Sequence, residues 1–161
     1  MFDVAVLAEL AAKIAGLDGH LYAVDDLLAG VKAIEEARRH LDAAEGALLG
    51  ELDARGTTDV VSGHRTANWL AHETGIAPVT AKARVRLAVA LRLDLPDTDR
   101  AVREGRLCAD RAKVMANAIN DRIATEFRQM EASLIAESAS MTFADWAQRV
   151  AIVAALLDQD G

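Results

Sequence analysis

Hydrophobic residues recur at helical spacing along almost the whole chain, and short polar or glycine-containing breaks separate the apolar runs. Apolar positions three and four residues apart line one side of an α-helix, whereas a half-buried strand would alternate apolar and polar residues. Because no convincing alternating run is present, the pattern predicts an all-α fold, a bundle of about six or seven helices. We expect one domain made of an N-terminal helix and loop, a long helix, a helix-turn-helix-like pair and a group of C-terminal helices, over residues 1–22, 25–55, 62–93 and 97–158.

The long helix expected over residues 25–55 carries apolar residues at intervals of seven, namely Leu27, Ile34, Leu41 and Leu48. A companion row at Val31 and Leu52 is interrupted by the charged residues Arg38 and Glu45. We expect Asp25 or Asp26 to cap the start of this helix, because a short carboxylate accepts hydrogen bonds from free backbone N–H groups. The spacing suits either an internal helix of a bundle or a seam between two copies of the chain.

The stretch from Ser62 to Leu91 predicts a helix, a tight turn and a second helix, after a polar connector over residues 57–63. The first helix should begin near Arg65 or Thr66 and end at Gly75, since glycine readily adopts the left-handed backbone of a helix end. Pro78 suits the first position of the second helix, where its missing N–H is not needed. Four residues of the second helix form an apolar row, Val79, Ala83, Leu87 and Leu91. A short glycine-containing turn between two helices is typical of the helix-turn-helix motif.

Length and composition restrict the possible core, the possible cysteine chemistry and the possible membrane segments of this chain. A chain of 161 residues provides enough material for one domain with a core, and aromatic residues make up only 4% of it, so Ala, Leu, Val and Ile must build that core. The single cysteine, Cys108, excludes an internal disulfide and a cysteine-based zinc site. We find neither a secretory signal nor an apolar run long enough for a membrane span, and we therefore expect a cytoplasmic protein without a membrane partner.

Charge is distributed unevenly along the chain. The whole sequence has a formal net charge of −7, but residues 60–92 hold five basic residues against a single acidic one, Glu73. These basic residues are Arg65, Lys82, Arg84, Arg86 and Arg92. A basic segment in an acidic chain predicts either a surface that faces phosphates or an ordinary solvated helix face.

Catalytic chemistry has little support in the sequence. The four histidines lack metal-ligand spacing, and the chain has neither a glycine-rich phosphate loop nor a nucleophile elbow. The adjacent His72 and Glu73 could exchange protons, but such a pair on a surface helix is usually plain surface. A small-molecule site near Trp69 and Trp146 has no group of polar residues to support it. We therefore expect no catalytic residue, no metal and no cofactor.

Several short motifs occur in a characteristic order: ELDARG at 51–56, Gly63 followed by Ala67-x-Trp69-Leu70, GIAPVTAKARVRLAVAL at 75–91, Leu95-Pro96, EGRL at 104–107 and LLDQDG at 156–161. Their order and spacing over about residues 27–161 resemble the actinobacterial 13E12 repeat family, which carries a domain of unknown function numbered 222 (DUF222). This resemblance implies a helical domain that is usually followed by an HNH endonuclease domain.

Two departures from the family pattern stand out. Family members usually have serine at the position of Cys108, so the helix that starts there should lack its hydroxyl cap. The family domain also continues beyond the position of Asp160-Gly161, and we therefore expect this chain to be an N-terminal fragment. Because no histidine follows His72 and no strand pair is evident, the HNH residues are absent, and we expect that this chain does not cut DNA by itself.

These observations lead to two hypotheses. The first is a non-catalytic module of an HNH-endonuclease-like protein that associates with double-stranded DNA, using six residues: Lys82, Arg84, Arg86, Arg65, His64 and Asn68. Lys82 and Arg86 share one helix face, whereas Arg84 projects elsewhere. Phosphate contacts would provide affinity without sequence preference. The second hypothesis is a protein-interaction module that forms a homodimer through the long helix and does not contact DNA.

Overall fold

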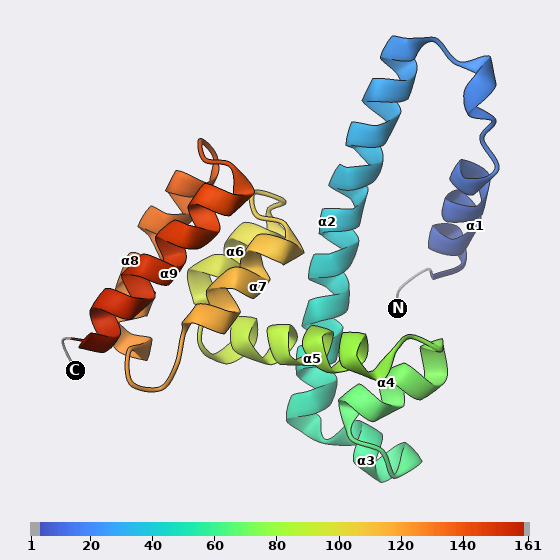
Figure 1. The fold of residues 1–161 in the computed structure, drawn as a ribbon. Helices are drawn as coiled ribbons and strands as arrows, with labels where there is room; N and C mark the ends of the chain where they lie inside the picture. The colour runs from blue at the N-terminus through green and yellow to red at the C-terminus, as the bar shows by residue number, and fades with distance from the viewer. Residues whose placement is uncertain (1–3, 160–161) are drawn as a thin grey trace. The chain divides into compact units, whose positions relative to one another are not determined.

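Residues 4–159, the part of the chain that the computed structural model describes, contain nine α-helices, one turn of 3-10 helix and no β-strand (Figure 1). The elements are α1 (Val4–Ala15), η1 (Gly19–Leu21), α2 (Val24–Arg55), α3 (Thr57–Ser62), α4 (Thr66–Thr74), α5 (Pro78–Leu93), α6 (Pro96–Arg103), α7 (Ala109–Ala118), α8 (Ala124–Ser138) and α9 (Phe143–Gln159). The all-α prediction is confirmed, and the expected number of helices was too low. No helix in this range combines the length and hydropathy that crossing a membrane requires.

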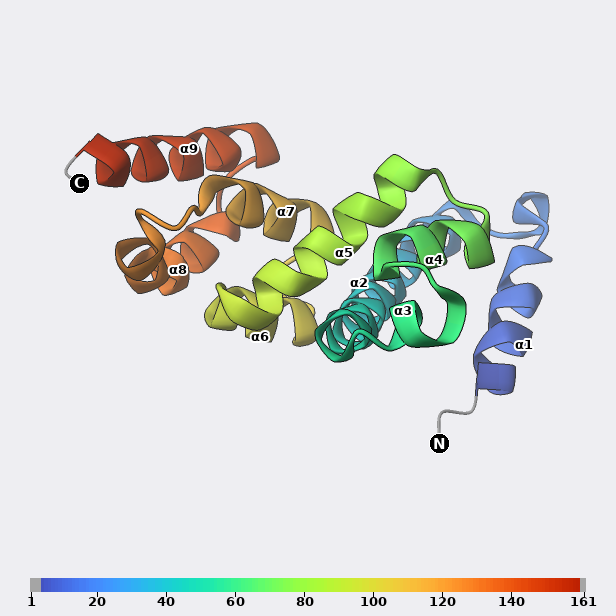
Figure 2. The same ribbon diagram turned by 90° about the horizontal axis from the view of Figure 1, so that it is seen from below.

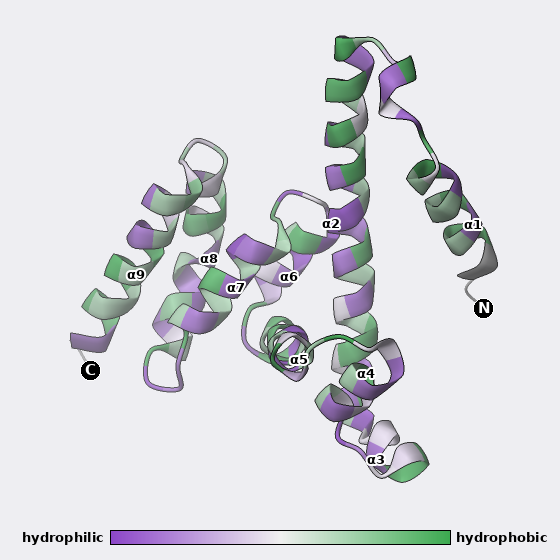
Figure 3. Ribbon diagram, turned by 45° about the vertical axis from the view of Figure 1, so that its right-hand side comes forward, coloured by the Kyte–Doolittle hydropathy of each residue, from purple (hydrophilic) through white to green (hydrophobic). Residues whose placement is uncertain are grey.

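By its internal contacts the chain divides into two units, residues 1–36 and 37–161, and α2 passes from the first into the second. In the first unit, α1 and the start of α2 are joined by η1, where the Asp18 carboxylate accepts a hydrogen bond from the backbone N–H of His20. Asp25 and Asp26 are not caps, because α2 already begins at Val24 and places both in its first turn. Carboxylates there still interact favourably with the helix dipole. Figure 3 shows α1 as largely hydrophobic, whereas hydrophobic and hydrophilic positions are interspersed along α2.

The first unit has no buried core among its described side chains. Every residue from Val6 to Asp42 is exposed, including the heptad residues Leu27, Ile34 and Leu41. Leu48, the next member of that row, is 49% exposed, whereas the neighbouring Leu49 is buried. The heptad row of α2 is therefore an exposed apolar surface, and the part of α2 that packs tightly begins near its last two turns.

The second unit is organised around α5, which packs against α4 and against both α6 and α7 (Figure 1, Figure 2). One apolar cluster combines Leu49 of α2, Leu70 of α4 and three residues of α5, Ala81, Val85 and Ala88. A larger cluster joins the end of α5 to α6, α7, α8 and α9, with Phe127 and Trp146 among its fully buried members. The central helix α5 is thus buried on two sides by two different sets of helices.

The buried side of α5 differs from the apolar row that the sequence suggested. Val79 is 75% exposed and Ala83 is also exposed, whereas Leu87 is half-buried and Leu91 is buried. Residues four apart turn by about 400° along a helix, so a row of four such residues drifts by about 120° and cannot stay on one side. Mixed spacings of three and four, as from Ala81 to Val85 and Ala88, do remain on one side and form the core face of this helix.

Helices α2 and α5 approach closely at Gly50. A Cβ atom at Gly50 would lie 3.2 Å from the carbonyl oxygen of Ala88, which is closer than side-chain carbons normally come. The missing side chain therefore lets α5 cross α2 at this point. Two ion pairs flank the crossing: Arg84 to Glu45 at 2.9 Å and Arg92 to Glu51 at 3.3 Å. The pKa of Glu51 is lowered mainly by its hydrogen bond with Arg55, and Arg92 lowers it further.

The segment predicted as a polar connector is mostly the short helix α3. Thr58 is buried, and its hydroxyl oxygen lies 3.2 Å from that of Thr66, the first residue of α4 and also buried. Glycines in the left-handed conformation, Gly56 and Gly63, bound α3 on both sides. The polar threonines therefore point inward and pair with each other, so this segment packs instead of remaining a loop.

A buried carboxyl group connects α6 and α8. The side chain of Glu131 is fully buried, and its Oε2 atom accepts hydrogen bonds from the backbone N–H of Thr98 at 2.7 Å and from the Thr98 hydroxyl at 2.8 Å. Glu131 thereby satisfies a backbone donor in the first turn of α6 that the helix itself leaves free. Burial raises the pKa of Glu131, and this effect outweighs the opposing hydrogen bonds from Thr98.

Candidate nucleic-acid interface

The two helices that the sequence predicted before and after Gly75 are present as α4 and α5. Helix α4 ends at Thr74, and Gly75 follows in the left-handed conformation with φ of 70°. Helix α5 begins at Pro78 in its first position, so three residues separate the two helices. The predicted boundaries of this pair are confirmed. Its exposed basic residues therefore project from α5 and from Arg65, which precedes α4, and the two helices pack against each other.

The structure separates the predicted basic residues of α5 into two groups. Arg84 points toward α2, where it hydrogen-bonds both carboxylate oxygens of Glu45, at 2.9 and 3.2 Å. Lys82 and Arg86 are exposed and lie one helical turn apart on another side of α5. Arg84 thus has an internal role, and its positive charge is balanced by a carboxylate.

Three cations of the second unit lack an internal partner. Among residues 37–159, the side chains of Arg65, Lys82 and Arg86 take part in no hydrogen bond or ion pair. Other basic side chains of this unit bind carboxylates or backbone carbonyls. Arg128, for example, pairs with the Asp94 carboxylate, and Arg111 donates a hydrogen bond to the carbonyl oxygen of Met141. Burying or pairing a charge inside the protein reduces its interaction with an external anion, so these three residues are the cations most readily available to a ligand.

The remaining predicted residues lie on or near α4. His64 precedes this helix, and its ring centroid lies 5.9 Å from that of His72. His72 in turn lies 3.1 Å from the carboxylate of Glu73, and all three side chains are exposed. Asn68 is also exposed on α4, one turn before His72. This exposed group does not resemble an enclosed catalytic site. Trp69 and Trp146 belong to different apolar clusters and share no site.

A cleft between α5 and α7 extends the basic surface beyond the predicted residues. This α5–α7 cleft has a volume of about 240 Å³, and four polar side chains line it: Lys82, Arg86, Lys113 and Asn117. Lys113 and Asn117 are one turn apart on α7, just as Lys82 and Arg86 are on α5. The sequence did not predict the α7 pair, because acidic and basic residues alternate around Lys113. No pattern in the neighbouring sequence shows which helix Lys113 faces.

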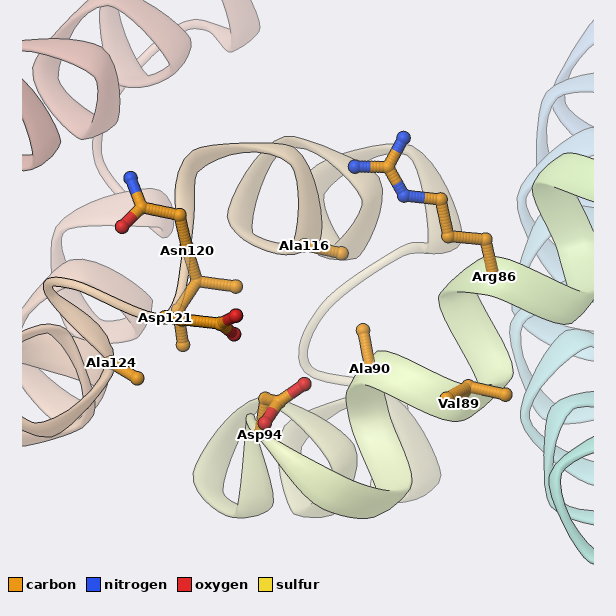
Figure 4. Close-up of a pocket in the computed structure, with 9 residues that line it drawn as sticks. Arg86, Val89, Ala90, Asp94, Ala116, Asn120, Asp121 and Ala124 are labelled. Carbon is orange, nitrogen blue, oxygen red and sulfur yellow. The ribbon is translucent and has the colours of Figure 1, made fainter. Parts of the chain in front are cut away.

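A second cleft adjoins the first and shares Arg86 with it. It has a volume of about 320 Å³ and is lined at its far end by Asp94, Asn120 and Asp121 (Figure 4). Arg86 extends from α5 along this cleft, on the side where α7 carries Ala116 (Figure 4). The electrostatic character therefore changes along the surface, from basic in the α5–α7 cleft to mixed in the adjoining one.

Comparison with protein-family models matches residues 28–161 to a domain of unknown function, DUF222. The chain belongs to the DUF222 family. The resemblance drawn from the sequence motifs is confirmed in this respect. A search of curated proteins found no match to the chain, and a search of solved structures found none either.

The DUF222 match includes every candidate interface residue and the whole of the second unit, whereas α1 lies outside it. Cys108 is half-buried at the start of α7 and makes no side-chain capping hydrogen bond, as the departure from the family pattern predicted. Within the described range 4–159, no three His, Cys, Asp or Glu side chains are grouped so that they could hold a metal ion.

Proposed function

We propose that this DUF222 chain is a non-catalytic module that associates with double-stranded DNA through a helix-turn-helix-like surface formed by α4 and α5. Lys82 and Arg86 contact phosphates, and Arg65 contributes from the start of α4. The observation that carries the proposal is that these three cations have no internal partner in the described part of the second unit. The resemblance to the 13E12 repeat family implies that an HNH domain elsewhere would perform any cleavage.

The charge distribution supports a local contact. The chain has a net charge of −7, so most of its surface repels a polyanion and only the basic surface can approach DNA closely. Contacts to phosphates provide affinity but read no sequence. We therefore expect modest binding that shows little sequence preference and weakens steeply as salt is added, because each neutralised phosphate releases counterions.

The test is fluorescence anisotropy of a labelled generic duplex across a salt series. The double variant Lys82→Ala, Arg86→Ala should bind more weakly, and the slope of log K against log salt should fall by about 2, or about 1 for each cation removed. A matched control is Arg84→Ala, Arg92→Ala, which removes the same charge from the same helix but from side chains paired with Glu45 and Glu51. If the two double variants bind equally well, the assignment of Lys82 and Arg86 is wrong.

A second candidate function is homodimerisation through α2, with no direct DNA contact. It is favoured by the exposed heptad row of α2, whose members Leu27, Ile34, Leu41 and Leu48 are 40%, 36%, 45% and 49% exposed. A row of large apolar side chains repeated every seven residues is typical of helices that pair with a second helix.

Light scattering distinguishes this candidate from a monomeric DNA-binding module. A dimer should dissociate when an aspartate replaces a residue of the row, as in Ile34→Asp or Leu41→Asp, because the charge would be buried at the seam. Ala29→Asp, which lies on the opposite side of the same helix, is the control and should leave the dimer intact. A wild-type chain that is monomeric at high concentration would rule out dimerisation.

A further inference from the structure

The α5–α7 cleft differs in charge from the other clefts around α5. All of its ionic side chains are cations: Lys82, Arg86 and Lys113. The adjoining cleft contains Asp94 and Asp121, and a further cleft beside α2 contains carboxylates from two helices, Asp42 and Glu51 of α2 and Asp99 of α6. Among these clefts, the α5–α7 cleft is therefore the one whose charge suits an anionic occupant throughout its length.

The shape of the α5–α7 cleft also restricts its occupant. Its lining combines apolar side chains, among them Ala83 and Leu87 of α5 and Ala116 of α7, with the three cations. Its volume of about 240 Å³ is below the roughly 300–1,000 Å³ typical of enclosed small-molecule sites. A chain of alternating sugars and phosphates suits this mixed lining, because its sugars can contact the apolar side chains while its phosphates meet the cations.

We infer that the α5–α7 cleft binds the sugar–phosphate backbone of one DNA strand. Lys113 and Asn117 of α7 contact this strand, as Lys82 and Arg86 of α5 do. This inference rests on the proposed DNA association and specifies where the backbone lies. Two pairs of residues, each one turn apart on its own helix, then hold one strand from both sides. An ammonium group and an amide N–H both donate hydrogen bonds to phosphate oxygens.

The internal partner of Lys113 does not prevent this role. Its Nζ atom lies 2.9 Å from a carboxylate oxygen of Asp110, three residues earlier on α7, and the two side chains are 44% and 74% exposed. Exposed ion pairs of this kind are weak and are screened by salt. A phosphate that enters the cleft can therefore replace Asp110 as the partner of Lys113. By contrast, Arg84 and Arg92 hold α5 against α2 and do not line the α5–α7 cleft.

The experiment uses the whole chain and a labelled generic duplex in fluorescence anisotropy across a salt series. Three proteins are compared with the wild type: Lys113→Ala, Asn117→Ala; Lys82→Ala, Arg86→Ala; and the control Arg103→Ala, which removes an exposed cation from α6 that is paired with Asp99. We expect the α7 variant to bind more weakly than the control and to lower the salt slope by about 1, since one cation is lost. Circular dichroism checks that each variant is folded. We expect the α7 variant to fold, because Asn117 is exposed and Lys113 is partly exposed.

The outcomes separate this inference from the proposed function. If the α5 variant loses binding while the α7 variant behaves like the control, the strand does not enter the cleft and the inference is wrong, although DNA association stands. If the wild type binds no duplex even at low salt, both fail. A second readout is the NMR amide spectrum during titration with the duplex, in which Ala116 and Asn117 should shift together with Lys82 and Arg86. Shifts confined to α4 and α5 would also overturn the inference.

Discussion

Replacing Trp146 with alanine should lower the free energy of unfolding by about 3–5 kcal/mol. The indole is fully buried at the centre of the larger apolar cluster, and its Nε1–H donates a 2.8 Å hydrogen bond to the carbonyl oxygen of Leu134. The guanidinium of Arg111 also stacks on the indole, 5.0 Å from the ring centre. Alanine would leave a large cavity between α8 and α9 and remove both polar interactions.

Chemical denaturation followed by circular dichroism measures this effect. Trp146→Phe retains most of the ring but loses the hydrogen bond, and we expect it to cost about 1–2 kcal/mol. Phe143→Ala is the control, because Phe143 lies one turn earlier on α9 and is 48% exposed, so its loss should change stability little. Equal midpoints for Trp146→Ala and Phe143→Ala would contradict the assigned core.

Removing the buried carboxyl group of Glu131 should have the second-largest effect. Glu131→Ala would leave the backbone N–H and hydroxyl of Thr98 without their shared acceptor in a buried position and would open a cavity next to them. We expect a loss of about 2–4 kcal/mol, measured by the same denaturation experiment. Thr98→Val, which keeps the backbone hydrogen bond and removes only the hydroxyl, should cost less. A loss for Glu131→Ala no larger than that for Thr98→Val would contradict the capping role.

The pH dependence of stability provides an independent test of the same group. Because burial raises the pKa of Glu131, the folded protein retains this proton to a higher pH than the unfolded chain does. The contribution of Glu131 to the free energy of unfolding therefore falls as pH rises from the ordinary carboxyl pKa through the raised one. Glu131→Gln carries no such proton, so its stability relative to the wild type should increase over that interval and then level off. A difference that is constant with pH would contradict the raised pKa.

Features fixed by local chemistry could be predicted from the sequence. The ends of α4 and α5 follow from Gly75, which adopts a left-handed conformation, and from Pro78, which suits a first helical turn. The common face of Lys82 and Arg86 follows from their spacing alone. These features need no knowledge of distant residues, and the structure retains all of them.

Features that depend on contacts distant in the sequence could not be predicted. Arg84 is paired with Glu45, 39 residues earlier, and this pairing separates it from the other basic residues of α5. Glu131 is buried and hydrogen-bonded to Thr98, 33 residues earlier, and no local pattern identifies that partner. The position of α7 beside α5, which brings Lys113 to the cleft, is likewise a result of packing around the larger apolar cluster.

The exposure of α1 and of most of α2 has a consequence for the synthesis of the protein. Translation delivers α1 and α2 before the helices α3 to α9, and none of the described side chains up to Asp42 is buried in the folded chain. The first buried residue of α2, Leu49, shares an apolar cluster with Leu70 and Val85, which are synthesised 21 and 36 residues later. During that interval the apolar row of α2 is an accessible target for a chaperone, and isolated helices are only marginally stable in water. The nascent chain therefore depends on α4 and α5 to fix the helix that precedes them.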